Sequence, residues 1–89
     1  MKILEYELVK TCERMPEQYD VFHHGEQVGY LRLRHGYFAA YRFGDDNHPL
    51  YKAEPVGDGE FMDNERKFHL TQAIKAIRKD ISRELRRAL

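Results

Sequence analysis

Cysteine is nearly absent from this chain of 89 residues, in which Cys12 stands alone. One cysteine cannot form an internal disulfide, so a reducing, cytoplasmic location is the default expectation. No apolar run approaches the 18 or so residues of a membrane-spanning helix, and the N-terminus lacks the apolar core and cleavage site of a signal peptide. The length predicts a single domain with one modest core and little room for a deep cleft.

Net charge is also absent, because 15 basic residues balance 15 acidic ones. The balance hides an asymmetry: residues 1–62 carry 7 basic and 11 acidic side chains, and residues 63–89 carry 8 basic and 4 acidic. A neutral total argues against strong sequence-independent DNA binding, which needs many unopposed cations. The basic C-terminal part still permits a local electrostatic contact.

Motifs that would signal catalysis or metal binding are missing as well. Gly57 and Gly59 match no phosphate-binding loop. The acidic segment 58–65 fails the calcium-loop pattern, since Met62 takes a ligand position and Asp63 stands where glycine is required. Five histidines lack the short spacings of a zinc site. We therefore expect no metal, no cofactor and no enzymatic activity.

Short alternating runs separated by turn residues predict antiparallel strands in the first part of the chain. Ile3 to Val9 alternates apolar residues with Glu5 and Glu7, which favours a strand. The dipeptides His24-Gly25 and His35-Gly36 each separate two such runs and predict two-residue hairpin loops with positive φ. Residues 50–54 suggest a fifth strand.

One long amphipathic helix is predicted at the C-terminal end. Asp63 or Asn64 can cap its first turn. A single apolar stripe follows at helical spacing; it consists of Leu70, Ile74, Ile77, Ile81, Leu85 and Ala88. The fold class is thus α+β: an antiparallel meander of four to five strands over about residues 2–54, a loop over 55–62, and a helix over about 63–88 packed on one sheet face.

Regular two-residue hairpins then assign the strand residues to two faces, since directly opposed residues share a face. The first face is aliphatic and is expected to meet the helix; it holds Phe22, Gly29, Leu31, Leu33, Phe38 and Ala40. The second is amphipathic and is expected to remain open; it holds Tyr19, Val21, Val28, Tyr30, Arg32, Arg34, Tyr37, Ala39, Tyr41 and Phe43.

Two groups of side chains are candidate binding sites. The first lies on the second face, where a row of tyrosines is flanked by arginines; it comprises Tyr19, Tyr30, Arg32, Arg34, Tyr37 and Tyr41. Aromatic residues and arginine are enriched at protein interfaces, and the same types stack bases and hold phosphates in nucleic-acid-binding sheets. The second group is a basic flank of the helix formed by Lys75, Lys79, Arg83 and Arg86. Both groups also fit ordinary solvated surfaces.

The N-terminal segment has an alternative interpretation, because Leu4, Leu8, Cys12 and Met15 also fit helical spacing. With that helix, and with Arg66-Lys67-Phe68-His69 near the start of the last helix, the element order resembles a double-stranded-RNA-binding domain. That resemblance implies RNA binding.

The sequence as a whole favours a small non-catalytic binding or adaptor domain. We expect it to act through protein–protein contact of its open sheet face, with a protein partner or with itself as a homo-oligomer, and without membrane insertion. The alternative is a single-stranded nucleic-acid or RNA-binding domain that uses the same face and the basic helix flank.

Overall fold

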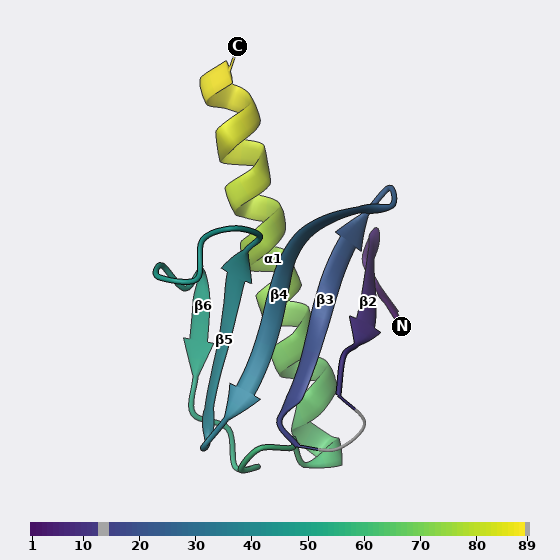
Figure 1. Ribbon diagram of the computed structural model, residues 1–89, viewed down its shortest axis with the longest axis vertical. Coiled ribbons are helices and arrows are strands. Elements are labelled where there is room, and N and C mark those ends of the chain that lie inside the picture. The colour runs from purple at the N-terminus through teal and green to yellow at the C-terminus, as the bar shows by residue number, and fades with distance from the viewer. Residues whose placement is uncertain (13–14, 89) are drawn as a thin grey trace.

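The computed structural model describes residues 1–12 and 15–88 and consists of one antiparallel sheet and one helix. The strands are β1 Lys2–Ile3, β2 Tyr6–Lys10, β3 Glu17–His23, β4 Glu26–Arg34, β5 Tyr37–Arg42 and β6 Tyr51–Ala53, and the helix is α1 Asp63–Ala88. The strands follow one another in the sheet in chain order, and α1 crosses one face (Figure 1). The predicted α+β class, meander and C-terminal helix are confirmed, with six strands in place of four or five.

The N-terminal segment forms a tight hairpin, not the single strand or the helix that its residues allowed. Leu4 has a φ of 55° at the turn between β1 and β2, and the Met1 carbonyl oxygen accepts from the Leu8 amide at 2.7 Å. Tyr6 and Leu8 are buried, whereas Leu4 is exposed. Because this segment is not helical, the element order that resembled a double-stranded-RNA-binding domain is not present.

Both predicted His-Gly loops are confirmed. The φ values are 52° and 78° for His24 and Gly25, and 55° and 73° for His35 and Gly36. Positive φ at both loop positions matches the right-handed twist of the flanking strands.

The register between β3 and β4 differs from the prediction because β4 contains a β-bulge. His23 pairs with Glu26 beside the loop as expected, but farther along Val21 pairs with Gly29 instead of Val28. The extra residue, Val28, shifts every later pair by one and so reverses the faces of β3. Tyr19 and Val21 are therefore buried on the helix side, where they pair with Leu31 and Gly29.

Four face assignments were therefore wrong. Tyr19 and Val21 belong to the helix side, and Val28 packs partly buried against the same core. Phe22 lies on the opposite face, opposed to Glu7 and Gln27. The other hairpin keeps its predicted register, with Leu33 opposite Phe38 and Tyr30 opposite Tyr41.

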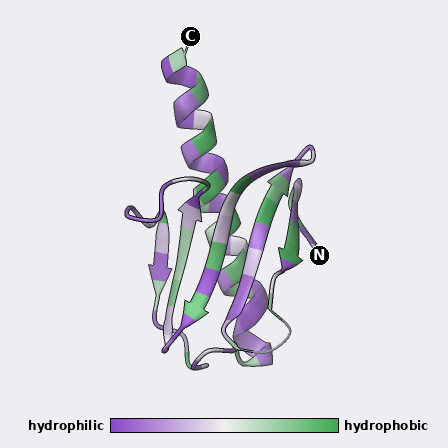
Figure 2. Cartoon of the chain, viewed as in Figure 1, coloured by the Kyte–Doolittle hydropathy of each residue, from purple (hydrophilic) through white to green (hydrophobic). Residues whose placement is uncertain are grey.

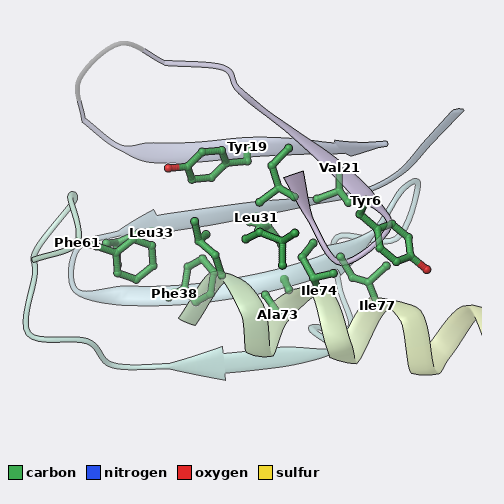
Figure 3. Packing of buried hydrophobic residues seen from close by; sticks show 14 residues of the cluster. Tyr6, Tyr19, Val21, Leu31, Leu33, Phe38, Phe61, Ala73, Ile74 and Ile77 are labelled. Carbon is green, nitrogen blue, oxygen red and sulfur yellow. The ribbon is translucent and has the colours of Figure 1, made fainter. Parts of the chain in front are cut away.

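The core lies between the sheet and α1 (Figure 3). Leu31, Leu33 and Phe38 of the sheet meet Ile74 and Ile77 of the helix, all with no exposed surface. Gly29 permits this close approach, because a Cβ there would lie 3.0 Å from Ile77 Cδ1 and 2.4 Å from the Tyr41 carbonyl oxygen. The aliphatic face meets the helix as predicted.

The helix continues beyond the sheet at its C-terminal end (Figures 1 and 2). Leu70, Ile74 and Ile77 are buried and Ile81 partly so, but Leu85 is 62% exposed and Ala88 is exposed as well. The predicted stripe is thus core only over its first four members.

The first turn of α1 is capped by an unexpected residue. Glu65 accepts backbone hydrogen bonds from Val56 at 2.8 Å, Gly57 at 2.8 Å and Met62 at 2.9 Å. Burial alone would raise the pKa of Glu65, but these three amides hold it below its ordinary value. Asp63, which was expected to cap, pairs with Arg66 instead. A carboxylate in the first helical turn that reaches back to the residue before the helix is one half of a capping box.

Candidate protein-binding surface

The sheet face away from α1 has no described helix or strand over it (Figure 1). We call this the open face. It is the outer side of a sheet that curls around the helix, since α1 contacts β1 at one edge as well as β4, β5 and β6. Its residues from the central strands are Gln18, Asp20, Phe22, Gln27, Tyr30, Arg32, Arg34, Tyr37, Ala39 and Tyr41, with Glu7 from β2 and Lys52 from β6.

A pair of tyrosines occupies the middle of the open face. Tyr30 and Tyr41 are opposed in the β4–β5 ladder, and their rings stack with centroids 4.9 Å apart and planes inclined by 23°. Tyr41 is only 8% exposed. Burial, followed by the charge of Asp46, raises the pKa of Tyr30, and the charge of Arg32 opposes that rise. Each of the two rings thus covers part of the other ring's surface.

Basic side chains lie on the part of the open face nearest the His35-Gly36 loop. Arg32 is opposed to Gln18 on one side and to Ala39 on the other, and Ala39 is opposed to Lys52. Arg34 follows two residues later on the same face. Within residues 1–12 and 15–88, Arg32, Arg34 and Lys52 form no ion pair. This end of the face is therefore basic among the described residues.

Acidic side chains lie toward the other end. Asp45 and Asp46 follow β5 and, with Gln27, Tyr30 and Phe43, line a shallow pocket of about 240 Å³. Asp20 is opposed to Tyr30. Phe43 is 62% exposed beside this acidic end, and Tyr37 is 41% exposed at the basic end. The open face is therefore divided along the strands into an acidic and a basic end, each with one exposed aromatic ring.

The structure brings together five of the six residues predicted for this surface. Tyr30, Arg32, Arg34, Tyr37 and Tyr41 share the open face. Tyr19 does not, because the β4 bulge turns it into the core, where it is 3% exposed. The glycine inside β4 was the one signal for a bulge, because glycine within a strand often marks one.

The predicted basic helix flank lies on the far side of the molecule. Lys75, Lys79, Arg83 and Arg86 are all exposed, and the side of α1 that carries them points away from the sheet. Arg83 also lies 3.9 Å from Asp80. A ligand seated on the open face cannot touch these four residues without wrapping around the edge of the sheet.

A buried charge cluster that sequence reasoning missed joins the sheet, the loop and the helix. Glu17 has no exposed surface and accepts from the Tyr19 hydroxyl, from the Phe61 amide at 2.9 Å and from Arg66 Nε at 2.8 Å. Burial would raise the pKa of Glu17, but the hydrogen bonds from Arg66, Tyr19 and Phe61 outweigh it and lower the pKa. The same burial and the Glu17 carboxylate raise the pKa of Tyr19. Since every oxygen is bonded, the cluster is structural.

The structure gives less support for a binding site elsewhere on the molecule. A pocket of about 370 Å³ lies between the start of β3, the end of β4 and the loop after β6, lined by Met15, Pro16, Arg34, His35, Asp58 and Gly59. In the described part of the chain, no three His, Cys, Asp or Glu residues are grouped to hold a metal ion. Over the same residues, no helix combines the length and apolarity needed to cross a membrane.

Comparison with known proteins adds no relative: no family model, no curated protein and no solved structure matches the chain. The open face therefore has to be interpreted from its own chemistry.

Proposed function

We propose that this chain is a small non-catalytic binding domain that acts through protein–protein contact of its open face, in a reducing cytoplasmic setting. The observation that supports this most is the uncovered centre of the sheet, where the stacked Tyr30 and Tyr41 lie beside Arg32. Rigid aromatic rings next to arginine are the composition enriched in interface centres. Tyrosine gives contact area at little entropic cost, because it has only two side-chain torsions.

Site-specific photo-crosslinking in cells tests this proposal. A benzophenone-bearing phenylalanine analogue in place of Tyr37 samples the open face, and the same residue in place of Phe68 is the matched control on the helix. Phe68 is 59% exposed against 41% for Tyr37, so exposure alone favours the control. We expect protein adducts at position 37 that exceed those at position 68 and that diminish when Tyr30→Ala is added. Equal labelling at both positions would contradict the proposal.

Nucleic-acid binding is a second candidate, supported by Arg32, Arg34 and Lys52, which lie together at one end of the open face. Three cations along one end of a sheet can follow a phosphate backbone. Two features make nucleic-acid binding the weaker of the two candidates. Tyr30 and Tyr41 already stack on each other, which leaves less ring surface for bases, and the basic helix flank lies on the opposite side of the molecule.

Binding to a fluorescent random oligonucleotide at two salt concentrations separates the two candidates. Protein contact predicts no measurable binding at physiological salt. Salt-sensitive binding that is lost in Arg32→Gln combined with Arg34→Gln would favour nucleic acid instead, because each phosphate contact releases counterions.

A further inference from the structure

We infer that the partner of the open face is a second copy of this chain, packed face to face with its strands antiparallel. This inference rests on the proposed function and specifies its partner. It follows from the strand register, which places unlike groups at equal distances from one row of residues. That row is Tyr19, Leu31 and Ala40, which are directly opposed across β3, β4 and β5 and point inward to the core.

A two-fold axis that runs over this row, parallel to the sheet, places each position of a strand over its mirror position in the other copy. In a two-fold contact the same patch must complement itself. On β4, Arg32 and Tyr30 lie one residue on either side of Leu31, so the guanidinium of one copy faces the tyrosine ring of the other. Asp20, which is opposed to Tyr30 on β3, lies beside that contact.

The outer parts of the face match in the same way. Tyr37 and Phe43 lie three residues on either side of Ala40, so the two most exposed aromatic rings of the face meet across copies. Beyond them, the acidic loop that contains Asp45 and Asp46 faces the partner copy's basic end, with Arg34. Asp20 thus lies beside Arg32 of the second copy, and Asp45 and Asp46 lie toward its Arg34.

The small size of the contact predicts a weak dimer. Because the sheet curls around the helix, the outer side is convex and contact is limited to β3, β4 and β5. Three strands about 4.8 Å apart with about 3.4 Å per residue give roughly 300–400 Å² per copy. This lies below the range of stable complexes and within that of transient ones. The dimer is therefore expected to be weak and to depend on concentration.

Charge reversal with complementation tests the arrangement. Arg32→Glu with Arg34→Glu makes the face acidic, and Asp20→Lys with Asp46→Lys makes it basic. Sedimentation velocity over a concentration series measures self-association of each variant and of their mixture, and circular dichroism confirms that each is folded. We expect each variant alone to dimerise at least about tenfold more weakly than the original chain, because like charges meet. An equal mixture should recover dimers, because each face then meets its complement.

Lys67→Glu, on the helix, is the matched control and should leave self-association unchanged. A chain that stays monomeric at millimolar concentration overturns the inference, as does a dimer that survives Arg32→Glu with Arg34→Glu. So does a mixture that does not recover. These failures are distinguishable from failure of the proposed function: photo-crosslinks from position 37 to a different protein would retain the binding face while refuting the second copy.

Discussion

The two His-Gly hairpins of this sheet begin alike and then diverge. Both have positive φ at both loop residues, and both pair the flanking residues as a two-residue loop requires. The β4–β5 hairpin keeps that register along its whole length, whereas the β3–β4 hairpin loses it at Val28. The difference teaches that a loop determines the first pair of a hairpin, and that one inserted residue determines which side chains reach the core.

Deleting single residues from the two hairpins tests this comparison most severely. Removing Ala39 from the regular hairpin should destabilise the chain by about 4 kcal/mol or more, because one register step turns inward residues outward. Removing Val28 only straightens the bulge and leaves the other faces unchanged. It should cost about 1–2 kcal/mol, for the lost core contact and the bonds to its carbonyl oxygen. Denaturant unfolding of both deletions measures the contrast, and equal losses would refute our account of the bulge.

The glycine beside the bulge is the next most sensitive position. Gly29→Ala should destabilise by about 2–4 kcal/mol, since the new Cβ meets the backbone oxygen of Tyr41, which cannot move without disturbing β5. Truncating Ile77 to valine in the same chain should not relieve this loss, because the backbone contact persists. Thermal melting of the single and double variants checks both statements; a stable Gly29→Ala protein would show that the strands can separate locally.

The two loops should respond equally to the same change. A Cβ added at Gly25 would have no atom within 4 Å, and one added at Gly36 would meet only Asp58 at 3.9 Å, so neither substitution causes a clash. Gly25→Val and Gly36→Val should each cost about 1–2 kcal/mol through the unfavourable positive φ alone. Chemical denaturation of the two variants gives the values. A difference above about 1 kcal/mol would mean that the loops are not equivalent.

The smallest effect concerns Glu17, which the bulge register directs toward the helix. Its pKa is lowered in the folded state, so the stabilisation it gives is complete above its ordinary value of 4.5 and declines as pH falls through the folded-state pKa. Between pH 7 and acid, we therefore expect the free energy of unfolding to decrease through this group. Glu17→Gln should flatten that part of the curve of unfolding free energy against pH. An unchanged curve would assign the acid sensitivity to other carboxylates.

Much of the fold was predictable because it depends on local signals. Each of these signals can be recognised within a few residues. They are the His-Gly loops, the alternation of inward and outward side chains in β4 and β5, and the helical spacing of Leu70, Ile74 and Ile77. The faces of β3 were not predictable in the same way, because a bulge depends on packing between strands, and Gly29 was its only local mark. The Glu17 cluster joins residues up to 49 positions apart, a distance at which a single sequence carries no pattern.

The same difference between local and non-local signals explains which residues of the candidate surface were predicted correctly. Tyr30, Arg32, Arg34, Tyr37 and Tyr41 were placed correctly because they lie in the hairpin whose register follows from its loop alone. Tyr19 was misplaced because it lies beyond the bulge. The separation of the basic helix flank from the open face depends on which side of the sheet the helix packs.

The chain-order arrangement of the strands also sets the kinetics of folding. Each strand pairs with its neighbour in sequence, so little loop-closure entropy opposes the hairpins, and topologies rich in such local pairing fold quickly. Docking of α1 is different, because its bonds to Glu17 close a long stretch of chain. We therefore expect the sheet to assemble first and the helix to dock in the rate-limiting step, so that a nascent chain exposes Leu31, Leu33 and Phe38 until α1 has been synthesised.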